Sequence, residues 1–132
     1  MGMKKYLYLA LVMILGARIS AADFKIQDMK IGDEGFLIIS LANADHQPVQ
    51  VTEEQKNKTF LVVYIDDLLR AEYKLKYFPE SLFAAKGKAE WKTNFRLEAN
   101  ARVRAEINLP PIIPEIRLRD NRLDKSFHSS NE

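Results

Sequence analysis

The chain has 132 residues, 47% of them hydrophobic and 29% charged, which is typical of a folded domain rather than a disordered chain. This length allows one domain, or one domain with a tail. The absence of cysteine excludes disulfides, thiolate catalysis and thiolate metal sites, and two histidines nearly exclude a multi-histidine metal site within one chain.

Residues 1–22 have the pattern of a secretory signal peptide. Two lysines give a positively charged start, and residues 6–17 form an apolar run. Small side chains at positions 20–22 predict cleavage before Asp23, and therefore a periplasmic or secreted protein. An uncleaved membrane anchor is the alternative, although a spanning helix needs about 20 apolar residues and an arginine interrupts this run.

Removal of this segment changes the charge of the protein. The whole chain has 20 basic and 18 acidic residues and a calculated pI of about 8.8. Lys4, Lys5 and Arg18 lie in the segment and no acidic residue does, so 17 basic and 18 acidic residues remain, a net charge of −1. The overall charge therefore gives no support to nucleic-acid binding, and we expect no nucleic-acid partner.

Short segments of alternating apolar and polar residues dominate the rest of the chain. The alternation runs through residues 69–77, 89–97 and 101–109, with the odd-numbered positions apolar. A period of two predicts strands with one face on the core and the other in water, and it excludes helices there. Residues 36–42 and 60–65 are apolar on both faces, which predicts central strands.

Two more strands and a set of turns complete the predicted domain. Residues 24–31 alternate but slip by one step at positions 28–29, which a β-bulge would restore, and residues 115–119 predict a short edge strand. Residues 125–132 are expected to be a flexible polar tail. Turn or loop residues separate the strands at 32–35, 43–58, 66–67, 98–100 and 110–114, and one helical turn is expected within 79–86.

Seven short strands without a long helix predict an all-β domain. The expected architecture is an antiparallel immunoglobulin-like β-sandwich over residues 23–124. The strands that are apolar on both faces favour two packed sheets, and a small barrel is the alternative.

The order of these segments resembles the cell-adhesion-related domain found in bacteria (CARDB), an immunoglobulin-like sandwich family. The matching features are the opening strand with its turn at 23–35, the second strand and its closing asparagine at 36–43, the strand ending in an aspartate turn at 60–67, the aromatic Trp91, and the closing segment at 116–121. The chain departs from the family at 79–87, where a glycine-rich turn is usual, and at 119–122, where the family is more acidic. The resemblance implies an extracytoplasmic binding or spacer module without catalysis.

Two acidic sites are candidates for calcium binding. Asp66 and Asp67 are adjacent, and Asp120 lies near Asp124, so each pair offers carboxylate oxygens. A turn, in which aspartate bonds to its own backbone, explains both patterns more simply. We therefore expect no metal and no other cofactor.

The sequence offers little for catalysis or for sugar binding. His46 and His128 have no recognisable nucleophile near them, and no serine lies in a glycine-flanked elbow, so we expect no enzyme, with a hydrolase as a remote alternative. Trp91 could stack on a sugar, but its parity places it on the apolar face, and Tyr73 and Tyr77 share that interpretation.

Candidate partner-binding residues lie in the long loop and on the polar strand faces. Cross-strand charge pairing is the simpler interpretation of the basic residues, and a basic stripe for an acidic partner is the alternative. The candidates are His46, Gln47, Gln50, Glu53 and Glu54 in the loop, and Lys92, Arg96, Arg102 and Arg104 on the strands.

These observations predict an exported, non-catalytic β-sandwich that binds a protein partner in the periplasm or at the cell surface. Contact would use an exposed sheet edge or the loop at 43–58. The alternatives are a structural subunit of an envelope assembly or filament, in which edge strands pair between copies, and a carbohydrate-binding module.

Overall fold

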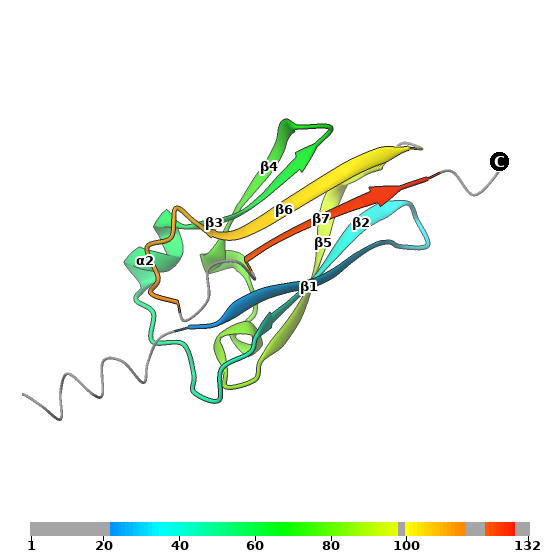
Figure 1. The fold of residues 1–132 in the computed structure, drawn as a ribbon. Helices are drawn as coiled ribbons and strands as arrows, with labels where there is room; N and C mark the ends of the chain where they lie inside the picture. Colours follow the sequence, from blue (N-terminus) through cyan, green and yellow to red (C-terminus); the bar gives the residue numbers. More distant parts are fainter. Residues whose placement is uncertain (1–21, 98–99, 116–120, 129–132) are drawn as a thin grey trace, which may run out of the picture.

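Two antiparallel sheets make up the domain in the computed structural model, which describes residues 22–97, 100–115 and 121–128 (Figure 1). One sheet has the strand order β1-β2-β5 and the other β4-β3-β6-β7. The strands are β1 (Phe24–Ile31), β2 (Phe36–Asn43), β3 (Phe60–Ile65), β4 (Leu68–Lys74), β5 (Lys88–Arg96), β6 (Ala101–Leu109) and β7 (Arg122–Phe127). The predicted all-β sandwich is confirmed at this level, and nearly all of the predicted signal segment lies outside the described residues.

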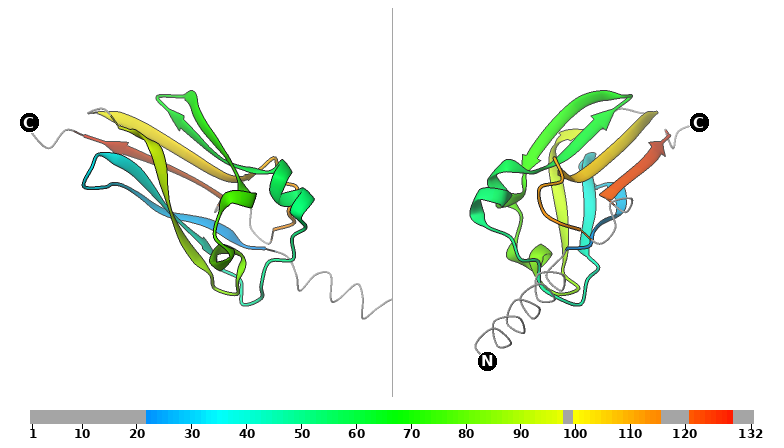
Figure 2. Two further views of the ribbon diagram at one scale, coloured as in Figure 1. Left: turned by 180° about the vertical axis from the view of Figure 1, so that it is seen from behind. Right: turned by 60° about the vertical axis from the view of Figure 1, so that its left-hand side comes forward.

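The connections differ at the two ends of the sandwich (Figure 2). Helix α2 (Glu53–Lys58) and the 3₁₀ turns η1 (Leu75–Tyr77) and η2 (Glu80–Phe83) lie at one end, while the β1–β2 and β3–β4 hairpins lie at the other. No helix among the described residues has the length and apolar character that crossing a membrane requires.

The core confirms the predicted alternation in most strands. β2 and β3 are central, as their two apolar faces predict, and the inward residues of β6 are buried. In β1 the register shifts by one residue at Gln27, so the predicted bulge exists and keeps Phe24, Ile26 and Met29 all on the core. Each such side chain contributes about 1.5–3 kcal/mol through burial.

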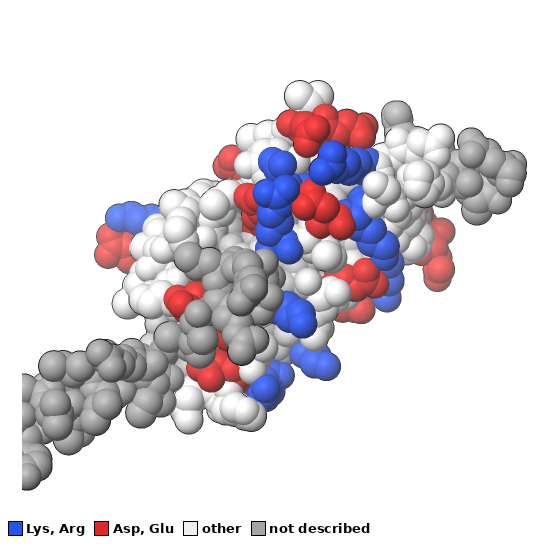
Figure 3. All heavy atoms as spheres, viewed as in Figure 1, with Lys and Arg blue, Asp and Glu red and all other residues white. Residues whose placement is uncertain are grey.

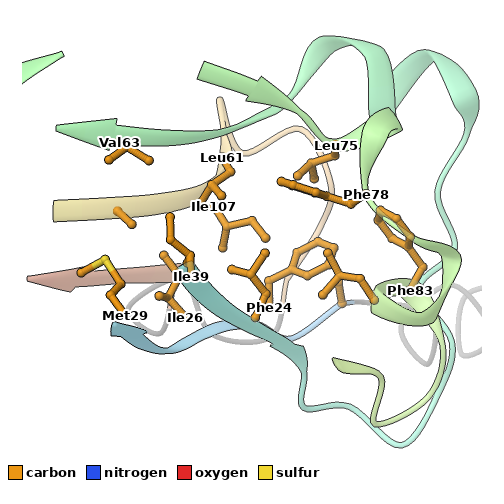
Figure 4. Packing of buried hydrophobic residues seen from close by; sticks show 14 of the residues in the cluster. Phe24, Ile26, Met29, Ile39, Leu61, Val63, Leu75, Phe78, Phe83 and Ile107 are labelled. Carbon is orange, nitrogen blue, oxygen red and sulfur yellow. The ribbon is translucent and has the colours of Figure 1, made fainter. Parts of the chain in front are cut away.

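The chain between β4 and β5 closes the core at the helical end (Figure 4). Leu75, Phe78 and Phe83 meet the side chains of the strands there. The predicted helical turn is present as η2, and Gly87 follows it because a Cβ at that position would lie 1.9 Å from the Ser81 carbonyl oxygen.

The prediction of a continuous strand over residues 69–77 is wrong at its C-terminal end. β4 stops at Lys74, and η1 turns the chain so that Phe78 is buried while Tyr77 is 63% exposed. The 3₁₀ turn changes the repeat from two residues to three, which removes Tyr77 from the core side. The core interpretation of Tyr77 is therefore wrong.

The loop at residues 43–58 contains a helix that the sequence analysis missed. The Thr52 hydroxyl accepts from the Gln55 backbone nitrogen at 3.1 Å, and the Gln55 side chain accepts from the Thr52 nitrogen at 2.9 Å. This capping box satisfies two free donors and starts α2. Lys56 then fastens the helix to η2, with its ammonium 3.1 Å from the Glu80 carboxylate and 4.5 Å from the centre of the Phe83 ring.

The C-terminal part of the chain corrects the predicted tail. Of the predicted strand at 115–119, Glu115 forms an isolated bridge with Ala22, and the remaining residues lie outside the described part of the chain. β7 instead occupies Arg122–Phe127, so the predicted tail begins inside a strand. The inner face of β7 carries a lysine between two apolar residues, so the strand lacks the apolar alternation by which the other strands were predicted.

That lysine, Lys125, joins the two sheets along one open side of the sandwich. It pairs with the buried Val103, so it starts on the inner face of β7. Its ammonium donates to the Asp28 carboxylate at 2.9 Å and to the Met29 carbonyl at 2.7 Å, both on β1. An inward-pointing charge on an edge strand also blocks pairing with another chain.

We predict that Lys125→Ala lowers the free energy of unfolding by about 1 kcal/mol, because it removes two hydrogen bonds between the sheets. Lys30→Ala is the matched control, since its bond to Glu90 at 3.4 Å is exposed, and the change should be smaller. Urea unfolding followed by tryptophan fluorescence measures both variants, and equal losses would contradict the bridging role.

The same bridge has a pH signature. The hydrogen bond from Lys125 lowers the pKa of the Asp28 carboxyl below its ordinary value. The stability that this pair supplies is therefore present above about pH 4 and is lost as the pH falls through the lowered pKa. The difference in stability between the wild type and Lys125→Ala should shrink in that acidic range.

Candidate protein-binding surface

A hollow of about 450 Å³ opens at the hairpin end of the sandwich, between the β3–β4 hairpin and the described residues at the end of β5 and the start of β6. Apolar side chains and two arginines line it together with the ends of the turns. The lining residues are Ile65, Asp66, Leu68, Leu69, Arg70, Arg96, Leu97, Asn100 and Ala101.

Leu68 and Leu69 are the apolar feature of this hollow. Leu68 is 73% exposed and Leu69 is 56% exposed, although they are adjacent in the chain. Single exposed leucines are ordinary on a protein surface, whereas a cluster beside a concave site is typical of binding surfaces. We name the hollow and these two leucines the hairpin-end site.

A β-bulge explains why Leu69 is exposed. Val63 pairs with Ala71 and Tyr64 pairs with Leu69, so Arg70 is an extra residue in β4. Paired residues share a face of the sheet, and Tyr64 lies on the outer face, where the Arg104 guanidinium stacks 4.2 Å from its ring centre. The bulge therefore turns Leu69 outward, which makes the prediction that Leu69 faces the core wrong.

The same bulge turns Arg70 toward the other sheet. Its guanidinium lies 5.1 Å from the ring centre of Phe95, which is buried on the inner face of β5. Arg96 on β5 also lines the hollow, and its guanidinium lies 5.1 Å from the ring centre of Phe36 on the outer face of the sheet. The two sheets thus each supply one arginine to the hairpin-end site.

The turn at the tip is fixed by the aspartates that were candidates for calcium. Asp66 and Asp67 have φ values of 51° and 66°, the left-handed conformation of a tight hairpin turn. Asp66 also bonds to Arg102 on β6, through its backbone nitrogen at 2.9 Å and through its carboxylate at 3.1 Å. This contact holds the hairpin against the neighbouring strand, which supports the turn interpretation.

Among the described residues, the arginines of the hairpin-end site differ from the other arginines in their ion pairs. Arg102, Arg104 and Arg122 lie within 4.0 Å of carboxylates on β6, β7 and the hairpin turn. Arg70 and Arg96 have no such ion pair in the described parts of the chain. The described arginines without a carboxylate partner are therefore the two that line the hollow.

The predicted strand residues do not form one surface. Lys92 and Arg96 lie on β5, and Arg102 and Arg104 lie on β6 in the other sheet. Basic and acidic side chains alternate over β6 and β7 (Figure 3). Lys92 pairs with Glu34 at 3.2 Å, so ion pairs account for three of these four residues, and the pair of Arg102 with Asp124 joins two strands.

The predicted loop residues lie at the opposite end, around α2. His46, Gln47 and Gln50 are exposed, and Glu53 and Glu54 are exposed in the first turn of α2. The structure brings none of them to the hairpin-end site, which shares only Arg96 with the predicted set.

The structure places the second calcium candidate in ion pairs. The Asp124 carboxylate lies 3.0 Å from Arg122, and Asp120 is outside the described residues. In the described ranges no group of three or more histidine, cysteine, aspartate or glutamate side chains could hold a metal ion.

Glu115 is a half-buried carboxylate, and its contacts are structural. Its carboxylate accepts from the Phe24 nitrogen at 2.7 Å, from the Asn108 amide at 2.6 Å and from the Asn121 amide. These bonds tie β1, β6 and the start of β7 together at the helical end. Burial raises the pKa of Glu115 above its ordinary value despite the three donors.

Trp91 is half-buried and packs against an aromatic cluster, which supports the core interpretation over a sugar platform. Its ring contacts Tyr73 at 5.3 Å and Phe78 at 4.3 Å between centres, both edge to face. The Tyr73 hydroxyl donates to Asn94 at 2.8 Å. This cluster spans the open side between β4 and β5, which agrees with the predicted core role.

Another hollow, of about 340 Å³, lies on the outer face of β3 beside Pro110 and Pro111. Its floor includes Val62, which is only 4% exposed, so neighbouring side chains already cover the apolar surface. The hairpin-end site is therefore the stronger candidate.

The sequence pattern gave no role to Leu68 and assigned Leu69 to the core, and Arg70 counted only as part of the possible basic stripe. The one available signal was the leucine pair directly after a two-residue turn, because neighbouring residues of a strand point to opposite faces. The side chain of one of the two leucines therefore has to point away from the core.

Comparison with known proteins gives no match to a family model, to a curated protein or to a solved structure. The candidate surface accordingly depends on the geometry described above.

We predict that the Glu115 carboxyl makes stability depend on pH. Because its folded-state pKa is raised, its contribution is fully present below about pH 4 and is lost as the pH rises through the raised pKa. Urea unfolding of the wild type and of Glu115→Gln between pH 4 and 7 should show the wild-type advantage falling with pH. An advantage that is constant or that grows would contradict this assignment.

Proposed function

We propose that this protein is an exported, non-catalytic β-sandwich module that acts by binding another protein in the periplasm or at the cell surface. The observation that carries this proposal is the hairpin-end site, where two exposed leucines lie beside two arginines without carboxylate partners in the described residues. The signal-peptide pattern of residues 1–22 supports export.

The strand order supports an immunoglobulin-like assignment within this proposal. Three strands face four, and the chain crosses between the sheets after β2, after β4 and after β5. Such crossing connections are features of immunoglobulin-like sandwiches. The resemblance to CARDB remains a prediction from the sequence.

The edges of the sheets favour a side-chain surface over strand pairing as the mode of contact. Bulges interrupt β1 at Gln27 and β4 at Arg70, and residues 93–95 interrupt the register of β5. The inward charge of Lys125 protects β7. Because bulges and inward charges discourage pairing of edges between chains, a filament built by edge strands has less support.

The test of this proposal is cross-linking in the cells that produce the protein. We predict that the tagged full chain, treated with a membrane-impermeant cross-linker, captures a protein that a tag-only control does not capture. The double variant Leu68→Ser/Leu69→Ser should lose at least about tenfold of this capture, as expected when an apolar anchor is removed. Its free energy of unfolding should stay within about 0.5 kcal/mol, because both side chains are largely exposed.

The variant His46→Ala/Gln47→Ala/Gln50→Ala is the matched control for the loop. It changes exposed residues at the opposite end and should capture the partner as the wild type does. Loss of capture in the loop variant alone would move the binding surface to the loop. Cytosolic fractionation of the chain, or capture no greater than with the tag alone, would overturn the proposed function itself.

A further inference from the structure

We propose that the hairpin-end site binds an extended acidic segment of a partner protein, with an apolar side chain of that segment against the leucines and a carboxylate at the arginines. This inference rests on the proposed function and adds the chemistry of the partner. It follows from the position of the apolar and basic groups around one hollow.

The apolar anchor is built from both sheets. Leu68 and Leu69 come from β4, and Leu97 follows β5 on the other side of the hollow. Since Leu68 pairs with Ile65 on the core side of β3, it extends the core beyond the end of the sandwich. A leucine-sized side chain in the hollow would remove this surface from water, at about 25 cal/mol for each Å² buried.

The anionic anchor comes from the two arginines. Both arginines line the hollow, their guanidinium groups stack on Phe95 and Phe36, and neither has an ion pair in the part of the chain that the structure describes. Arginine presents a planar fork of donors that suits a carboxylate. Asp66 lies at the rim, where its carboxylate accepts from the Arg102 nitrogen, so the acidic group of a partner would sit on the arginine side.

Two other occupants fit the charges less well. A second copy of the chain, docked by a two-fold axis through this face, would bring arginines against arginines. A membrane surface would meet the exposed Asp66 and Asp67 first, at the tip of the hairpin, and anionic lipids repel carboxylates. An acidic peptide segment avoids both conflicts.

The test uses four synthetic ten-residue peptides of one scaffold, labelled with fluorescein, and fluorescence anisotropy. Their central residues are Asp-Asp-Leu-Leu, Asn-Asn-Leu-Leu, Asp-Asp-Ser-Ser and Lys-Lys-Leu-Leu. The protein is the full chain as its host exports and processes it. Vesicles containing phosphatidylglycerol provide the membrane arm of the experiment.

We expect the Asp-Asp-Leu-Leu peptide to bind at least about tenfold more tightly than each of the other three. The Asn-Asn-Leu-Leu peptide lacks the negative charges, the Asp-Asp-Ser-Ser peptide lacks the apolar side chains, and the Lys-Lys-Leu-Leu peptide carries positive charges instead. Binding should weaken as salt is raised, since the exposed charges are screened.

Two double variants with the same loss of charge test whether the two arginines bind the acidic residues of the peptide. Arg70→Gln/Arg96→Gln should weaken binding of the acidic peptide at least about tenfold and leave the Asn-Asn-Leu-Leu peptide unchanged. Lys25→Gln/Lys88→Gln removes the same net charge from exposed lysines on β1 and β5 that do not line the hollow, and should leave peptide binding within about twofold. Far-ultraviolet circular dichroism confirms that each variant folds.

Equal binding of the acidic and amide peptides, or full binding by the arginine variant, would overturn the inference. Vesicle binding that depends on the leucines, without peptide binding, would also overturn it in favour of a membrane surface. If cross-linked capture depends on the leucines while no peptide binds, the acidic-segment inference fails and the proposed function stands. If capture fails as well, both fail.

Discussion

The alternation of side chains along a strand, and its reversal by a bulge, is the constraint on which this structure depends. A strand presents successive residues to opposite faces, so one extra residue exchanges the two faces beyond it. In β1 the extra residue Gln27 keeps Met29 in the core. In β4 the extra residue Arg70 has the opposite effect, because it moves Leu69 out of the core and an arginine toward it. A bulge thus keeps an apolar side chain in the core in one sheet and places an apolar side chain on the surface in the other.

The two open sides of the sandwich are closed by different chemistry. Along β1 and β7 the connection is polar, through Lys125, Asp28 and a backbone carbonyl. Along β4 and β5 it is aromatic, through Tyr73 and Trp91 together with Phe78. A chain without disulfides needs such contacts, because a domain of this size buries a limited apolar surface.

The two ends of the sandwich also differ in how many of their polar groups have partners and in how much apolar surface they expose. At the helical end, α2 is capped and fastened by Lys56, and Glu115 accepts three hydrogen bonds. At the hairpin end, leucines are exposed and two arginines lack carboxylate partners within the described residues. This contrast is why the candidate surface lies at the hairpin end and not in the long polar loop, where the sequence analysis placed most of its candidates.

The sequence by itself determined the all-β class, six of the seven described strands, the bulge in β1 and the turn at Asp66 and Asp67, because each leaves a local pattern of apolar period or turn residues. Only the tertiary structure decided the position of Leu69 and Arg70. The bulge in β1 shows as a slip in the alternation, but residues 69–77 alternate without a slip, so the bulge in β4 left no trace. A bulge is a mismatch in residue number between two paired strands, so it exists only once β3 and β4 have paired, even though a two-residue turn joins them. For the same reason, which arginines find carboxylates could not be deduced from any strand alone.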